Sequence, residues 1–244
     1  MWTILIKICR VLIGWGVRVY GQLLANDSSR KFFPLINPAQ QIDSSRGEYL
    51  RLLTARFANL PGMISDRQAQ VLFELCVSQA ISGNIVEIGS WLGKSTLFLA
   101  SGCRVSGNGQ VYAVDKFTGN LGKEDLYHAP LLPNETIYDR FKFNIKSYRL
   151  NKFVKAYPMS SRQARRKIKQ TLRMVFIDGD HSYKGVMDDI KLWTPLLKKG
   201  GLLILDDFDQ SFPGVVRAVQ EKILHSAQFK PLFELDSLLV ARKG

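Results

Sequence analysis

Short apolar runs alternate with amphipathic stretches from about residue 85 to the end of the chain. Five runs end in polar turn residues and are expected to be strands: 85–89, 110–115, 153–157, 173–178 and 201–206. Helices are expected between and after them, near 94–102, 135–149, 161–170, 184–198 and 213–226. Phe229–Leu235 and Ser237–Arg242 are expected to close the chain as a hairpin about Asp236. Alternating strands and helices predict an α/β fold, a doubly wound parallel sheet with helices on both faces.

The pattern before residue 85 is helical. A helix is expected over Ser44–Phe57, and Ser65 with Gln68 forms the sequence of a capping box that opens a second helix to about Ile81. The stretch from 26 to 41, with two prolines, is typical of a linker. We therefore expect three parts: an amphipathic helix over 1–25, a linker and accessory helix over 26–60, and the main domain over 61–244.

The first 25 residues place a narrow polar stripe, with Lys7, Arg10 and Arg18, against a broad apolar surface. Their longest charge-free stretch, 11–17, is far shorter than the roughly 20 residues that span a bilayer. Two interpretations remain open: a helix lying on an anionic membrane surface, or a helix packed against another subunit of a homo-oligomer.

The formal net charge is +13, and residues 140–173 contain twelve Lys or Arg and no Asp or Glu. Such a run is usually a solvated face, but it could also attract an anionic membrane, an anionic substrate or RNA. The three cysteines have no metal-type spacing and suit a reducing compartment, so we expect a cytoplasmic protein that could be peripheral at the inner membrane face.

Ile85–Thr96, with the sequence IVEIGSWLGKST, is the most informative segment. The spacing of Gly89 and Gly93 excludes a phosphate loop, which needs four residues between its glycines, and Trp91 excludes a dinucleotide fingerprint. A short glycine turn preceded by the carboxylate of Glu87 suits a cationic ligand and indicates S-adenosylmethionine. Asp115 ends the next strand, where a carboxylate can accept the hydroxyls of a ribose.

Acidic residues end the fourth and fifth predicted strands. Asp178 ends one, and Asp206 and Asp207 end the other. If these strands are neighbours, the three carboxylates meet at one sheet edge, and a hard divalent cation, Mg²⁺ first, would relieve their repulsion. Helix capping is the structural alternative. His181, three residues after Asp178, has the side chain of a catalytic base at neutral pH.

These segments together resemble class I S-adenosylmethionine-dependent methyltransferases, most closely the subgroup of macrocin-type sugar O-methyltransferases and cephalosporin-hydroxylase-like proteins. The resemblance extends from about Pro61 to Arg242 and is carried by five segments: PGMIS at 61–65, VEIGSWLGKST at 86–96, VYAVD at 111–115, IDGDHSY at 177–183 and LDDF at 205–208. Catechol and caffeoyl-CoA O-methyltransferases are more distant relatives.

The resemblance implies a Rossmann-like sheet of seven strands with the last one antiparallel. It implies that Glu87, Gly89 and Ser90 bind the methionine end of the cofactor, that Asp115 binds its ribose, and that Ser160 lies near its adenine. It also implies Asp178, Asp206 and Asp207 as metal ligands and His181 in the position of the catalytic base. The distant relatives have Asn where this chain has Asp207.

The resulting hypothesis is methyl transfer from S-adenosylmethionine to a hydroxyl of a sugar, glycan or other small molecule, with Mg²⁺ at the site. An RNA methyltransferase is one alternative, prompted by the 140–173 run. The N/D-P-P-Y/F loop of amine-methylating enzymes is absent, however, so nucleic acid is the less favoured partner. A cofactor-binding or membrane-bound protein without activity is the other alternative.

Overall fold

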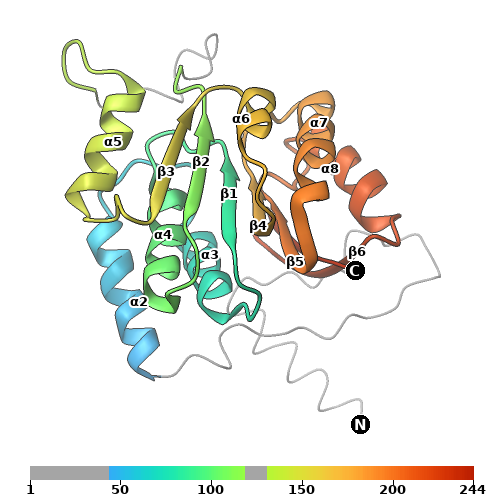
Figure 1. Cartoon of the computed structure of the whole chain (residues 1–244), viewed down its shortest axis with the longest axis horizontal. Helices are drawn as coiled ribbons and strands as arrows, with labels where there is room; N and C mark the ends of the chain where they lie inside the picture. Colours follow the sequence, from blue (N-terminus) through green and yellow to red (C-terminus); the bar gives the residue numbers. More distant parts are fainter. Residues whose placement is uncertain (1–43, 119–130) are drawn as a thin grey trace.

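The computed structural model of the chain describes residues 44–118 and 131–244. The predicted helix at 1–25 and most of the loop between the second strand and the next helix lie outside this range. Helices and strands are labelled as in Figure 1. Among the described residues, no helix is both long and apolar enough to cross a membrane.

Seven strands form one sheet in the order β3-β2-β1-β4-β5-β7-β6. Their bounds are β1 Asn84–Ile88, β2 Val111–Asp115, β3 Val154–Pro158, β4 Leu172–Ile177, β5 Leu197–Leu205, β6 Phe229–Leu235 and β7 Leu238–Lys243. Strands β1 to β5 are parallel to one another, and β7 is antiparallel to both β5 and β6. The predicted fold class, including the antiparallel last strand, is confirmed.

Helices cover both faces of the sheet (Figure 1). Their bounds are α2 Ser44–Phe57, α3 Asp66–Ser78, α4 Lys94–Ser106, α5 Ile137–Ser147, α6 Ser161–Lys167, α7 Tyr183–Trp193 and α8 Pro213–Val219, the last continued by a π-helical turn, Gln220–Leu224. Alternate strand residues face opposite sides, so β1 sends Ile85 to the core under α2–α5 and Val86 to the core under α6–α8. Both cores are apolar and buried.

Several element ends differ from the sequence prediction, including the C-terminal end of α4, which is Ser106 rather than 102. The helix expected over 184–198 ends at Trp193 and is followed by a 3₁₀ turn, Thr194–Leu196, because Pro195 cannot donate a helical hydrogen bond. The helix expected over 161–170 ends at Lys167. Strand β5 begins at Leu197 rather than 201, since Leu197 pairs with Leu172 before an irregularity in the pairing.

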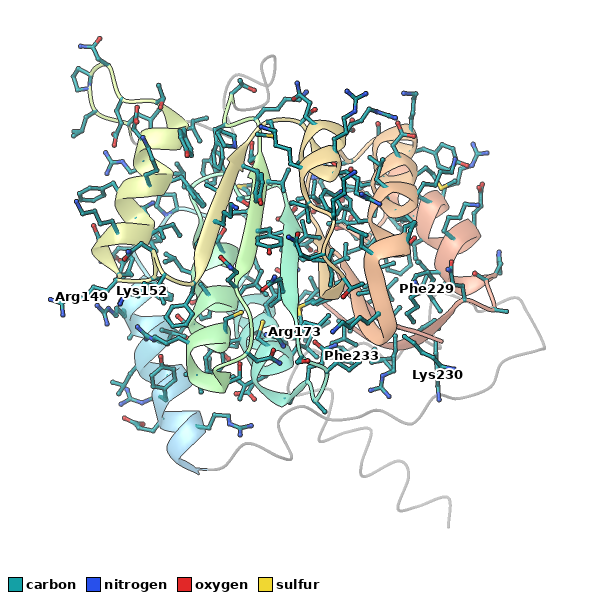
Figure 2. The ribbon with its side chains drawn as sticks, viewed as in Figure 1. Arg149, Lys152, Arg173, Phe229, Lys230 and Phe233 are labelled. Carbon is teal, nitrogen blue, oxygen red and sulfur yellow. The ribbon has the colours of Figure 1, made fainter. Side chains whose placement is uncertain are left out.

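The basic run at 140–173 does not form one exposed stripe. Arg173 is fully buried, and its guanidinium donates to the backbone carbonyls of Cys76, Gly83 and Asn108. Figure 2 shows Arg173 inside the domain, whereas Arg149 and Lys152 extend outward from the connection after α5. Three other members, Arg140, Lys142 and Arg162, form ion pairs with Glu135, Asp139 and Asp188. Some of the positive charges in this run therefore form contacts within the protein and are not available to an anionic partner.

Candidate active site at the carboxyl edge of the sheet

The glycine turn after β1 is built by close backbone packing. Gly89 has φ 89°, and a Cβ at this position would lie 1.8 Å from the carbonyl oxygen of Asp178. Its N–H donates to Val114 (2.9 Å), so the turn is tied to β2 as well as to β4. Only glycine fits here, as the sequence indicated. Gly93, with φ 92°, is the N-cap of α4.

Glu87 is fully buried beneath this turn. Its Oε2 accepts hydrogen bonds from the hydroxyls of Ser90 (2.8 Å) and Thr96, while Oε1 has no hydrogen-bond partner among the described residues. Burial raises the pKa of Glu87 to about 7 against the opposing effect of the Ser95, Thr96 and Ser90 hydroxyls. A buried carboxylate with a free oxygen suits a ligand that brings a positive charge or a hydrogen-bond donor.

Asp115 at the end of β2 organises the same turn. Its Oδ2 accepts the backbone N–H groups of Ser90 (3.0 Å) and Trp91 (2.8 Å), and its Oδ1 accepts that of Phe117 (2.6 Å). An ionised carboxylate offers about four lone-pair sites, so capacity remains for a further donor such as a hydroxyl. The position fits a ribose-binding residue, but in this structure Asp115 also holds the turn.

Ser160 lies at the end of β3, where it is the N-cap of α6. Its hydroxyl accepts the N–H of Gln163, and the Gln163 side chain accepts the Ser160 N–H in return. This capping contact is structural, and the predicted position of Ser160 near an adenine stays a prediction.

Asp178, His181 and Asp207 are brought together at the ends of β4 and β5. Each offers one ligand atom, and these atoms lie within 4.8 Å of one another. His181 Nε2 is 2.8 Å from Asp207 Oδ2, and this hydrogen bond raises the pKa of the imidazole. Burial, followed by the negative charges of Asp206 and Asp207, raises the pKa of Asp178 well above its usual range.

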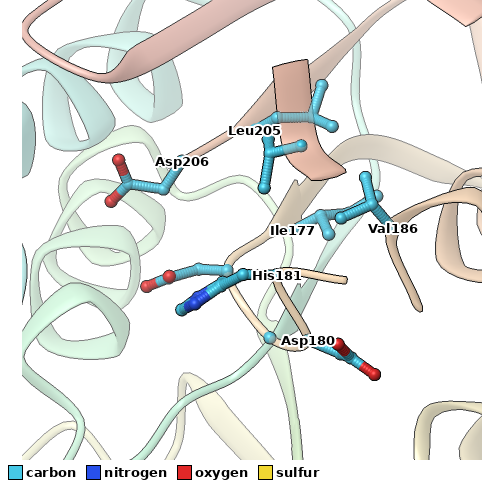
Figure 3. Close-up of a pocket in the computed structure, with 9 residues that line it drawn as sticks. Ile177, Asp180, His181, Val186, Leu205 and Asp206 are labelled. Atoms are coloured by element: carbon cyan, nitrogen blue, oxygen red, sulfur yellow. The ribbon is translucent and has the colours of Figure 1, made fainter. Parts of the chain in front are cut away.

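Asp206 lies beside this group but is engaged differently. Its Oδ1 accepts three hydrogen bonds, from Gln68 Nε2 (2.9 Å), Ser237 Oγ (2.8 Å) and the Asp207 N–H (2.8 Å). Figure 3 shows the polar ends of Asp206 and His181 on the same side of the pocket, with Asp180 pointing the other way. The apolar wall of this pocket includes Ile177, Val186, Leu205 and Val215.

The donor set fits a divalent cation. Carboxylate oxygens suit Mg²⁺ and Mn²⁺. Burial first, and then repulsion from neighbouring carboxylates, raises the pKa of Asp178 and of Asp206, and a cation would relieve that repulsion. Two of the three predicted ligands, Asp178 and Asp207, therefore lie in one group with the predicted base His181. Asp206 follows the same strand as Asp207 but is not part of that group, and one of its oxygens is already used within the protein.

Three further residues were not singled out as site residues by the sequence. Trp91 has φ 39° and a buried indole N–H without a hydrogen-bond partner among the described residues. Gln68 was identified only as a capping residue, and Ser237 only as part of the closing hairpin. Gln68 and Ser237 both contact Asp206, although they lie 138 and 31 residues from it in the sequence. No local sequence pattern predicts contacts over such separations.

The chain matches the profile of a family described as a methyltransferase domain over residues 86–208. This range contains the glycine turn, Asp115, the Asp178–His181 segment and the Asp206–Asp207 pair. The chain therefore belongs to the methyltransferase domain family, and the prediction of a class I methyltransferase is confirmed.

Solved structures of O-methyltransferases have the same fold. An O-methyltransferase from Bacillus cereus, in complex with SAH, is 23% identical, with a TM-score of 0.56 over 83% of this chain and 91% of that chain. The O-methyltransferase NovP is 20% identical (TM-score 0.62, covering 76% and 83%). CalS11, a TDP-rhamnose 3'-O-methyltransferase of calicheamicin biosynthesis, is 16% identical (TM-score 0.56, covering 83% and 96%). At these identities the likeness concerns the fold.

Proposed function

We propose that this protein transfers a methyl group from S-adenosylmethionine to a hydroxyl of a sugar or another small molecule, with Mg²⁺ bound at the site. The observation that carries the proposal is the convergence of two groups at one sheet edge. One is the glycine turn over Glu87, whose Oε1 has no partner in the part of the chain that the structure describes. The other is the Asp178–His181–Asp207 cluster. The fold likeness to a TDP-rhamnose methyltransferase supports a sugar acceptor.

The donor site would be formed by Glu87, Gly89 and Ser90 at the methionine end, Asp115 at the ribose and Ser160 near the adenine. S-adenosylmethionine, when bound, supplies an electrophilic methyl carbon whose bond to sulfur breaks as the bond to the acceptor oxygen forms. The backbone of Gly89 packs closely against that of Asp178, which fixes the turn. A fixed turn would position the donor, and positioning of this kind supplies much of the rate in methyl transfer.

His181 would take the proton of the acceptor hydroxyl. Its Nε2 is held by Asp207 Oδ2 at 2.8 Å, which leaves Nδ1 for the acceptor and keeps the ring in a fixed orientation. The imidazole accepts a proton only when it is neutral, so we expect turnover to increase as pH increases through its raised pKa.

Asp178, Asp206 and Asp207 would hold the metal ion. A divalent cation, when bound there, supplies positive charge that stabilises the developing alkoxide. The structural support is the grouping of Asp178 and Asp207 with His181, together with the placement of Asp206 in the same pocket.

The test is a labelled-methyl transfer screen against fractionated lysate, with and without EDTA. The proposal predicts a labelled low-molecular-weight hydroxyl compound, loss of labelling with EDTA and recovery with Mg²⁺. Labelling of RNA that does not depend on metal would support the RNA methyltransferase alternative instead. Failure to bind S-adenosylhomocysteine at all would favour a protein without this activity.

We propose that residues 1–25 attach the enzyme to a membrane surface or to another subunit. We infer that their apolar face lies on the anionic inner surface of a membrane, with Lys7, Arg10 and Arg18 near the headgroups, in an otherwise cytoplasmic protein. Packing against another subunit is the competing proposal for the same apolar face.

A further inference from the structure

We propose that Gln68 and Ser237 are positioning residues that orient Asp206 for the metal ion. The inference rests on the proposed metal site and concerns residues outside it. Gln68 is 4% exposed and Asp206 7% exposed, so the contact between their side chains is buried. Gln68 Nε2 donates both to Asp206 Oδ1 (2.9 Å) and to Ser237 Oγ (3.0 Å).

The effect of these contacts is to make the two oxygens of Asp206 unequal. Oδ1 accepts from Gln68, from Ser237 and from the N–H of Asp207, which uses its acceptor capacity. Oδ2 has no hydrogen bond to any described residue and is the oxygen left for a cation. Outer partners that orient a ligating carboxylate in this way tune metal affinity.

The same contacts also restrain Asp207. The Ser237 carbonyl accepts the N–H of Phe208 (2.9 Å), and the Ser237 hydroxyl donates to Asp206. The β6–β7 turn therefore contacts the residue before Asp207 and the residue after it. Asp207 has φ 57°, a left-handed conformation that is uncommon outside glycine. Residues in such conformations persist where the surroundings over-determine them. Held in this way, Asp207 places Oδ2 2.8 Å from His181.

The positioning role can be separated from the helix-capping role of the same residue. Gln68 Oε1 accepts the N–H of Ser65 (2.8 Å) in the capping box of α3, while Nε2 serves Asp206. Glutamate serves the capping box as well as glutamine does. It has no N–H for Asp206, however, and would add a second negative charge beside that carboxylate. Glutamine is the residue that meets both requirements.

The experiment is calorimetric titration of the full chain with Mn²⁺ alone, for the unaltered protein and for Gln68→Met and Ser237→Ala. We expect both variants to bind Mn²⁺ about tenfold more weakly, in the range that loss of such partners produces. Affinity for S-adenosylhomocysteine should stay within about twofold, because the donor site is built from β1, β2 and β3. Ser237 lies in a partly exposed turn, so its variant is informative even if a change at the buried Gln68 prevents folding.

Ser65→Ala is the matched control. It removes the other half of the capping box and a hydrogen bond from the Ser65 hydroxyl to Asp236 Oδ2 (3.1 Å), but it leaves the Gln68 amide and the Ser237 hydroxyl on Asp206. It should therefore lower the unfolding temperature without weakening Mn²⁺ binding. An equal loss of Mn²⁺ affinity in Ser65→Ala would contradict the inference, as would unchanged affinity in both Gln68→Met and Ser237→Ala. If the unaltered protein does not bind Mn²⁺, the proposed metal site fails and the inference fails with it.

Discussion

At the scale of single residues, two carboxylates and a histidine carry the proposed chemistry through the unusual environments in which the fold places them. Glu87 is buried with one oxygen unpartnered, Asp207 takes a left-handed conformation, and His181 is fixed by Asp207. The sequence predicted which residues these would be because they end apolar strands. It could not predict that three donors engage one oxygen of Asp206.

Glu87 should make donor-site binding depend on pH. Its pKa is about 7, and the ammonium group at the methionine end of S-adenosylhomocysteine favours the ionised carboxylate. Because the ionised fraction increases between pH 6 and pH 8, affinity should increase about tenfold over that interval. Calorimetry across this range checks the prediction. Glu87→Gln should bind S-adenosylhomocysteine with an affinity that depends little on pH. If its affinity increased with pH as that of the unaltered protein does, Glu87 would not be a donor-site residue.

His181→Ala should reduce turnover about a hundredfold or more, as expected for loss of a general base. Affinity for S-adenosylhomocysteine should stay within a few-fold, since His181 lies at the end of β4 and not in the glycine turn. Methyl-transfer kinetics against pH are the measurement. His181 would be excluded as the base if turnover of the variant were unchanged, or if its turnover still increased with pH as that of the unaltered protein does.

At the scale of elements, the apolar runs predicted every strand because each run ends in polar turn residues. The start of β5 was missed because Lys198, Lys199, Gly200 and Gly201 have the composition of a turn. In the sheet, Gly200 takes φ 75° within an irregular stretch of the strand. The capping box at Ser65 was predictable from four consecutive residues, whereas the contacts of α3 with the β6–β7 turn require the folded sheet.

The packing of α6 against α7 gives a prediction about stability. Trp193 Nε1 donates to Ser161 Oγ (2.8 Å), and that hydroxyl donates to Asp189, which is 6% exposed. Burial raises the pKa of Asp189 to about 6 from 3.8. Because the folded state holds a proton that the unfolded state has lost, the contribution of Asp189 to stability is full below about pH 4. It is lost as pH increases to about 6.

Asp189→Asn should remove this dependence. Relative to the unaltered protein, the variant should become more stable as pH increases from 4 to 6, by up to about 3 kcal/mol for a shift of roughly two pKa units. Above pH 7 the difference between the two proteins should be constant. Urea unfolding at several pH values measures it. A difference that does not change with pH would mean that Asp189 is not a buried titrating group.

At the level of the whole molecule, the glycine turn after β1 and the acidic cluster lie at one edge of the sheet, and the family match at 86–208 spans both. The segments that would bind the methyl acceptor, and those that would attach the protein to a membrane or to another subunit, have no comparable motif in the sequence. The basic run illustrates the difficulty, since its members divide between a buried Arg173, ion-paired residues and exposed side chains such as Arg149. Charge along the chain did not predict that division.

Removal of residues 1–25 tests the attachment proposal. The truncated protein should no longer sediment with vesicles that contain anionic lipid, because it loses the apolar face and its three cations. If the same segment instead joins two subunits, the mass by light scattering should decrease while vesicle binding stays the same. A truncation that changes neither would exclude both proposals.

Calorimetric titration with S-adenosylhomocysteine measures whether the turn between β1 and α4 binds the methyl donor. We expect one binding site per chain. We also expect at least about tenfold weaker binding in Asp115→Ala, which removes both the ribose acceptor and the restraint on Ser90 and Trp91. Absence of binding by the unaltered chain, or equal affinity in Asp115→Ala, would contradict donor binding at this turn.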